Sequence, residues 1–205
     1  MIAALTPLLY TMGPAALLLI MAVVFAESGL LVGFFLPGDS LLFLAGALVA
    51  SGVIGLPIWL LGLGVYVAAV LGDQVGYSIG RRLGPRLFSR EDSRLFSQAN
   101  ADRARRFFDS HGSGAVVLAR FVPVVRTFVP AVAGVAHMPR RVFTTYNLLG
   151  AAVWSAMIVT AGYLFGGITF IAAHIELITI GLAGLSVVPA GITYLRHRRA
   201  RSVRM

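Results

Sequence analysis

The stretch Phe34–Gly46, FFLPGDSLLFLAG, places a proline, a glycine and an aspartate inside one of the most apolar parts of the chain. A carboxylate is costly in an apolar environment, and a Pro-Gly pair interrupts the helix that carries it. Pro37 and Gly38 are therefore predicted to form the tip of a hairpin, with Asp39 facing a polar cavity.

The composition around this stretch is that of a membrane protein. Of the 205 residues, 58% are hydrophobic and 12% are charged. Several charge-free runs exceed the ~20 apolar residues that a bilayer span needs. These runs cover residues 1–26, 40–72, 142–175 and 177–195. The sequence predicts an all-α, polytopic membrane protein with a single membrane domain, 1–205.

The basic residues and the absence of cysteine argue against several kinds of function. No cysteine is present and the four histidines are scattered, so neither a disulfide nor a metal site is expected. All 17 basic residues are arginine, and most cluster in residues 81–106 and 196–204. Such loops beside spans follow the positive-inside rule, which we favour over nucleic-acid binding. Both clusters and both termini are expected in the cytoplasm, and no cofactor is expected.

The first hydrophobic passage is too long for one span. Residues 40–72 would measure about 50 Å as one helix at ~1.5 Å per residue, whereas a hydrocarbon core is about 30 Å thick. The break is predicted at SGVIGLP, residues 51–57. A short arm of a re-entrant hairpin (40–50) precedes it, and a full span from Ile58 to about Gly80 follows.

The same pattern recurs 86 residues later (121 − 35 and 162 − 76). Pro123 and Pro130 interrupt the chain before and within a short apolar segment, residues 127–139, and both are predicted hairpin-tip residues. A span from Val142 to about Gly167 follows. Discontinuous segments at corresponding positions of two halves indicate a transporter site. The matching blocks are FLP (35–37) with FVP (121–123), and GYxxG (76–80) with GYxxG (162–166).

Charge then orients the segments. A helix from about Pro14 to Phe34 is expected to bring the chain to the outer side. The first span ends at the Arg81 cluster and the second begins after Arg140 and Arg141, so the two units form an inverted repeat. The expected units are the first repeat (27–84), a basic amphipathic segment on the cytoplasmic membrane surface (85–110), the second repeat (111–168), and a last span with a basic tail (176–205).

Four ionisable residues lie within the broken apolar segments: Glu27, Asp39, Arg120 and Arg126. Each costs about 2–3 kcal/mol or more at mid-bilayer unless it is paired or hydrated. Irregular backbone at that depth is tolerated where it is buried in protein or lines a cavity, which favours a transport pathway. The alternative is a pair of structural salt bridges that fasten one hairpin to the other.

The four charges suggest a ligand. Two guanidiniums in a low-dielectric cavity suit a phosphate, which accepts bidentate hydrogen bonds from arginine. Glu27 and Asp39 can neutralise the arginines when phosphate is absent. They can also take up protons, because burial disfavours the charged form of a carboxylate. Phosphate binding and proton uptake would then be linked.

Polar residues on the two spans are secondary candidates for the pathway. Asp73 and Tyr77 are candidates on the first span, where Asp73 either gates the pathway or ties helices together. Asn147 lies on the second span. The aromatic residues Tyr146 and Trp154 of that span are expected to be packing or interface residues.

These motifs resemble the DedA family, the bacterial branch of the superfamily of VTT-domain, or SNARE-associated Golgi-type, membrane proteins. The resemblance covers about residues 27–166. It rests on Glu27, FLPGDSLLFLAG (35–46), GDQVGYSIGRRLG (72–84) and HGSGAVVLARFVPVVRTFVPAVAGVAHM (111–138).

The resemblance implies a bacterial inner-membrane protein in which two re-entrant hairpins meet at mid-membrane. It also implies that Glu27, Asp39, Arg120 and Arg126 are the essential charges. Family members are implicated in returning polyprenyl-phosphate carrier lipids to the cytoplasmic leaflet, with the proton gradient as the driving force.

The expected function is a proton-coupled flippase, not an enzyme, that moves undecaprenyl phosphate from the outer to the cytoplasmic leaflet. Its partners would be protons and a membrane lipid with a phosphate head group. One alternative is a phospholipid flippase or scramblase of the phosphatidylethanolamine type. Others are a lipid phosphatase, disfavoured because the histidines are isolated, and a purely structural membrane protein. The sequence leaves open whether the chain forms a homo-oligomer.

Overall fold

The computed structural model describes residues 9, 11–30, 38–87, 108 and 112–165, and every regular element in these ranges is a helix. The described part of the chain contains no strand. The order of elements is η1 (Gly13–Ala15), α2 (Ala16–Gly29), α3 (Gly38–Ala50), α4 (Ile58–Leu87), α6 (Ala115–Ala119), α7 (Pro123–Val135) and α8 (Arg140–Phe165).

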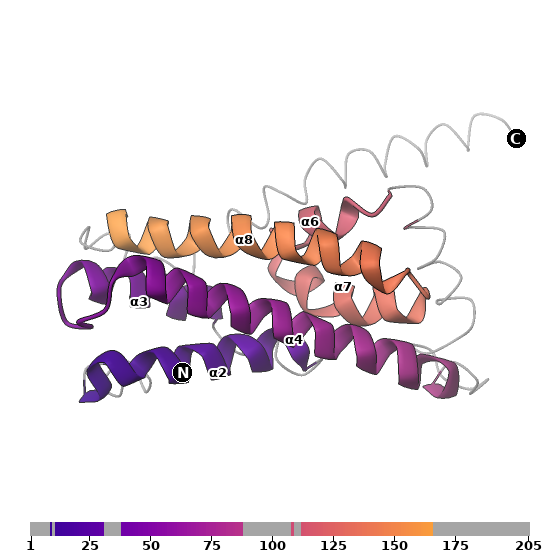
Figure 1. Ribbon diagram of the computed structural model, residues 1–205, viewed down its shortest axis with the longest axis horizontal. Coiled ribbons are helices and arrows are strands. Elements are labelled where there is room, and N and C mark those ends of the chain that lie inside the picture. Colours follow the sequence, from indigo (N-terminus) through magenta and orange to yellow (C-terminus); the bar gives the residue numbers. More distant parts are fainter. Residues whose placement is uncertain (1–8, 10, 31–37, 88–107, 109–111, 166–205) are drawn as a thin grey trace, which may run out of the picture.

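Two long helices, α4 and α8, form the frame of the bundle and run in opposite directions (Figure 1). Each contains a 26-residue stretch that is long and apolar enough to cross a membrane, Ile58–Leu83 and Arg140–Phe165. At ~1.5 Å per residue such a stretch is about 39 Å long, more than a hydrocarbon core of about 30 Å. Helix α4 begins at Ile58, as predicted, but continues beyond Gly80 to Leu87.

Three shorter apolar helices, α2, α3 and α7, have 13 or 14 residues each. At ~1.5 Å per residue they are about 20 Å long, too short to cross a bilayer alone. Helix α2 ends at Gly29, and Leu30 has extended backbone. The predicted helix from about Pro14 to Phe34 is therefore too long.

Two of the predicted chain breaks, residues 51–57 and Pro123, fall between these helices, whereas the prediction of a hairpin tip at Pro130 is wrong because this residue lies within a helix. Helix α3 ends at Ala50 and α4 begins at Ile58, so residues 51–57 form the connection, in which Gly52 has a φ of +75°. Pro123 occupies the start of α7, where its fixed φ suits a first helical turn. Pro130 lies inside α7, and the helix continues through it.

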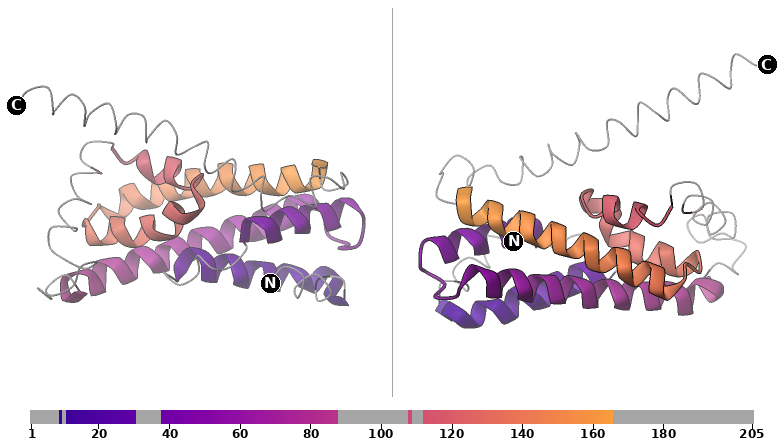
Figure 2. Two further views of the ribbon diagram at one scale, coloured as in Figure 1. Left: turned by 180° about the vertical axis from the view of Figure 1, so that it is seen from behind. Right: turned by 45° about the horizontal axis from the view of Figure 1, so that its top comes forward.

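Two of the short helices, α3 and α7, each pack mainly against the long helix from the other half of the chain, whereas α2 packs mainly against α4 of its own half. Helix α3 lies along α8, and α7 lies along α4, towards opposite ends of the bundle (Figure 2). Glycines allow this close approach. A Cβ at Gly46 would meet the backbone of α8, and a Cβ at Gly134 would meet the backbone of α4 at Tyr77.

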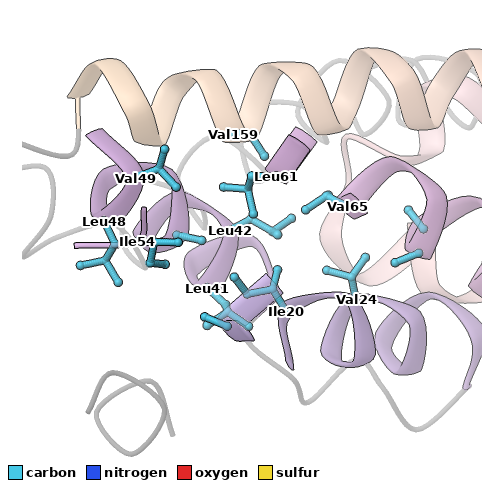
Figure 3. Close-up of a cluster of buried hydrophobic side chains, with 14 of the residues drawn as sticks. Ile20, Val24, Leu41, Leu42, Leu48, Val49, Ile54, Leu61, Val65 and Val159 are labelled. Atoms are coloured by element: carbon cyan, nitrogen blue, oxygen red, sulfur yellow. The ribbon is translucent and has the colours of Figure 1, made fainter. Parts of the chain in front are cut away.

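Apolar side chains fill the interior and also cover the outside. The largest buried cluster joins α2, α3, α4 and α8, and includes Ile20, Leu42, Val65 and Val159 (Figure 3). On the outer face of α4, large apolar residues recur at every fourth position, and Trp59 is 65% exposed. The residues of this stripe are Trp59, Leu63, Val67, Leu71 and Val75. An outward stripe of this kind suits a helix that faces lipid.

Three sequence predictions concern residues outside those that the structure describes. They are the hairpin-tip residue Pro37, most of the basic segment 85–110, and the last span with its tail, 176–205.

Candidate functional site

Five charged side chains gather where the short helices meet the long ones. Each lies on a different part of the chain; Glu27, Asp73 and Arg120 are buried, and Asp39 and Arg126 are nearly so. Their side chains are only 7–11% exposed. They are Glu27 near the end of α2, Asp39 in the first turn of α3, Asp73 in the middle of α4, Arg120 at the end of α6, and Arg126 in the first turn of α7.

Arg126 is bound by two carboxylates. Its Nη1 lies 2.5 Å from Asp39 Oδ1, and its Nη2 donates to Glu27 Oε1. Gly38 makes this arrangement possible, because a Cβ at that position would collide with the Glu27 carboxylate. The Asp39 carboxylate also lies at the N-terminus of a helix, where negative charge is favoured. The Arg126 cluster therefore ties α2, α3 and α7 together.

Arg120 is bound by one carboxylate and one amide. Its Nη2 pairs with Asp73 Oδ2 and donates to Asn147 Oδ1 at 2.6 Å. Asn147 is fully buried, and its Nδ2 donates to the carbonyl oxygen of Val70 at 3.3 Å. Gly150 leaves room for the arginine, since a Cβ there would lie 3.0 Å from Arg120 Cδ. This second cluster joins α6 to both long helices.

Trp154 lies against both guanidiniums. The centroid of its ring is 4.7 Å from Arg126 Cζ and 6.0 Å from Arg120 Cζ, within the range of cation–π attraction. The side chain is 4% exposed, so the contact is shielded from solvent. The expectation that Trp154 is only a packing or interface aromatic missed this role. Its place two helical turns after Asn147, on the same face of α8, was the available signal.

A small cavity lies between the two arginines. Its volume is about 10 Å³, enough for about one water molecule. The lining residues are Ser28, Asp73, Arg120, Arg126, Thr127 and Trp154. Asp39, which the sequence places at a polar cavity, faces Arg126 and is not among them. The structure therefore shows a small site in which carboxylates pair with both guanidiniums.

The charges of the cluster do not balance. Three carboxylates and two guanidiniums, all ionised, carry a net charge of −1 (2 − 3). Uptake of one proton by the carboxylates would make the buried cluster neutral. An unbalanced charge in a low-dielectric site is costly.

Tyr77, the third secondary candidate, lies away from this cluster. Its hydroxyl donates to the carbonyl oxygen of Met138 at 2.6 Å and accepts from Arg81 Nη1 at 2.7 Å. Its ring stacks on Phe143, with centroids 4.6 Å apart. These contacts fasten the turn between α7 and α8 to α4. Of the secondary candidates, the structure brings Asp73 and Asn147 to the arginines, but not Tyr77.

Comparison with known proteins gives consistent matches over most of the chain. The model of the VTT domain matches residues 36–164. The DedA protein of Escherichia coli is 43% identical over 178 residues, which cover 87% of this chain and 81% of that protein. A membrane protein of Mycobacterium tuberculosis is 43% identical over 189 residues, which cover 92% and 83%. The inner membrane protein YghB of Escherichia coli is 37% identical over 176 residues, which cover 80% and 79%. No solved structure matches.

Proposed function

The chain belongs to the DedA family of VTT-domain membrane proteins, and on that premise we propose that it is a lipid flippase. The proposed substrate is a polyprenyl-phosphate carrier lipid, undecaprenyl phosphate, which returns from the outer to the cytoplasmic leaflet. The proposed setting is a bacterial inner membrane, with both termini in the cytoplasm. A relative named as an inner membrane protein supports this location.

The observation that carries the proposal is the pair of buried arginines at one cavity. A phosphate monoester offers several oxygens to bidentate guanidinium donors, and Arg120 and Arg126 line the same space. Ser28 lines it as well, and a serine hydroxyl can donate to a further phosphate oxygen. The polyprenyl tail needs no site in the protein, because it can stay in the surrounding lipid.

The helix packing supports an inverted repeat with two re-entrant hairpins. Helices α3 and α7 are each too short to span, yet α3 packs along α8 and α7 along α4, towards opposite ends of the bundle (Figure 2). Half-helices of this kind in transporters end near the bilayer midplane and present their termini to the ligand. Asp39 and Arg126, in the first turns of α3 and α7, lie at such termini and are paired with each other.

The proposed mechanism is an exchange of anions on the arginines. An incoming phosphate takes the place of one or more carboxylates, and the displaced carboxylates are then buried without a cation. Burial favours their neutral form, so they take up protons from the outer side. Loss of these protons to the cytoplasm restores the ion pairs and releases the phosphate. The proton gradient would in this way drive the lipid inwards.

The proposal is tested by transport in proteoliposomes. Labelled undecaprenyl phosphate is placed in one leaflet, a pH gradient is applied, and movement to the other leaflet is measured for the wild type and Arg126→Ala. The matched control is Arg141→Ala, which removes an exposed arginine outside the site. We expect the gradient to accelerate movement in the wild type and the control, and Arg126→Ala to abolish it.

Two results separate this proposal from its alternatives. Wild-type rates no faster than those of protein-free vesicles would refute a flippase. If labelled phosphatidylethanolamine moves faster than the polyprenyl phosphate and competes with it for transport, the protein is a phospholipid flippase or scramblase. The same measurement in cells is the amount of carrier lipid exposed at the surface, which should rise with Arg126→Ala.

A further inference from the structure

We infer that Asp73 is an internal competitor for the lipid phosphate: it occupies the phosphate's place on Arg120 in the closed site, and the phosphate displaces it. This inference rests on the proposed function and refines it. It assigns the exchange to one of the two arginines and to a carboxylate of a long helix, rather than to Glu27 or Asp39.

The position of the cavity is the first observation. Of the three carboxylates in the cluster, only that of Asp73 belongs to a residue that lines the cavity between the arginines. Glu27 and Asp39 pair with Arg126 but do not line this cavity. An anion that enters this space therefore meets the Asp73 carboxylate on Arg120. Asp73 is the carboxylate with which it competes directly.

The surroundings of the two arginines are the second observation. Displacement of the carboxylate on Arg120 leaves one buried anion without its cation, whereas displacement at Arg126 leaves two. A buried charge without its partner is strongly destabilising, so exchange at Arg120 costs less. Arg120 also keeps its position during the exchange, because Asn147 and Trp154 still hold it.

The backbone around Asp73 is the third observation. The preceding Gly72 packs against α2, and a Cβ there would meet the carbonyl oxygen of Phe25 and the side chain of Ser28. Helix α4 is therefore fixed at this point, and Asp73 leaves Arg120 by rotation of its side chain. Ser28 lines the same cavity, and its hydroxyl is a donor that can receive the displaced carboxylate.

The experiment uses Trp154 as a reporter of binding. The chain has two tryptophans, and Trp59→Phe replaces the exposed one, so that fluorescence comes from Trp154 beside the arginines. In this background the purified full chain is titrated with inorganic phosphate and with a short-chain prenyl phosphate. Three proteins are compared: the wild-type site, Asp73→Asn and Glu27→Gln.

Asp73→Asn and Glu27→Gln are a matched pair, because each removes one buried negative charge from the cluster. We expect Asp73→Asn to bind both probes about tenfold more tightly than the wild-type site. Glu27→Gln should change the affinity much less, since Asp39 still holds Arg126. In proteoliposomes, Asp73→Asn should bind lipid but release it slowly, so that transport falls although affinity rises.

The outcomes separate this inference from the proposed function. If the wild type binds and transports while Asp73→Asn binds no more tightly, the inference is wrong and the flippase proposal stands. An equal gain in Glu27→Gln also overturns it, because the effect would then reflect net charge and not competition. If no variant binds either probe, both fail. Asp73→Ser, compared by thermal unfolding, provides a second variant if Asp73→Asn does not fold.

Discussion

Arg126 and Arg120 lie against the same tryptophan ring, but their surroundings differ in charge and in architecture. Arg126 is held by two carboxylates, one from each of the short helices α2 and α3. Arg120 is held by one carboxylate and one amide, which come from the long helices α4 and α8. The two carboxylates at Arg126 exceed its single positive charge, whereas the one carboxylate at Arg120 equals it.

This difference indicates a division of labour. The Arg126 cluster joins three helices that are each too short to cross a membrane, so its ion pairs hold these helices together. The Arg120 cluster connects the frame of the bundle and places its carboxylate at the cavity. The alternative of purely structural ion pairs therefore describes Arg126 better than Arg120.

The largest effect on stability is expected from Arg126→Ala. This change leaves Glu27 and Asp39 buried together without a cation, and breaking a buried ion pair in this way costs about 3–5 kcal/mol. Thermal unfolding in detergent should show the loss as a large drop in Tm. The triple variant with Glu27→Gln and Asp39→Asn should recover much of it. A triple variant no more stable than Arg126→Ala would contradict the electrostatic explanation.

Arg120→Ala is expected to destabilise less than Arg126→Ala, because it leaves one carboxylate unpaired and not two. Asp73→Asn added to it should restore stability, since a neutral amide can be buried at a smaller cost. The same unfolding measurement checks both points. Equal losses of stability in Arg120→Ala and Arg126→Ala would contradict the proposed difference between the two arginines. Loss of transport is expected in both variants.

Much of the fold could be predicted from sequence because helix breakers and lengths are local properties. The 33 uncharged residues from 40 to 72 exceed one bilayer crossing, and the glycines and proline of residues 51–57 mark where the chain must turn. The end of α2 at Gly29 was missed, because the apolar run continues to Phe34 without a charge after Glu27.

The sequence predicted which charged residues form the site, but not which of them pair with each other. The four charges in broken segments are conspicuous because they are costly there, and the structure brings all of them together. The partner of Arg120 depends on how the long helices are rotated about their axes, which an apolar sequence determines weakly. Asp73 and Trp154 lie on those helices, so their approach to the arginines follows from tertiary packing.

A smaller effect is expected from Asn147→Leu, which keeps the branched shape of the side chain but removes the amide. The change deprives Arg120 Nη2 of one acceptor and the Val70 carbonyl of one side-chain donor, at a cost of about 1–3 kcal/mol. Transport should fall further than stability, because Arg120 then lacks the contact that holds it during exchange.

The matched control for Asn147→Leu is Gln74→Leu. Gln74 donates to Thr144 Oγ1 at 3.0 Å and so links the same two long helices outside the arginine clusters. It should lower stability slightly and leave transport unchanged. A similar loss of transport in both variants would show that the link between α4 and α8 matters, and not the contact with Arg120.

The smallest effect is expected from Trp154→Phe, which keeps an aromatic face but weakens the cation–π attraction. The loss should be about 1 kcal/mol or less, because phenylalanine binds cations less strongly than tryptophan but still packs in the site. The nearer guanidinium should lose more, and Arg126 Cζ is 4.7 Å from the ring centroid against 6.0 Å for Arg120. Double-mutant cycles with Arg126→Gln and Arg120→Gln, followed by unfolding, measure the two coupling energies separately. A larger coupling energy to Arg120 than to Arg126 would contradict this expectation. The ring would then stabilise mainly Arg120, the arginine at which we infer the exchange of carboxylate and phosphate.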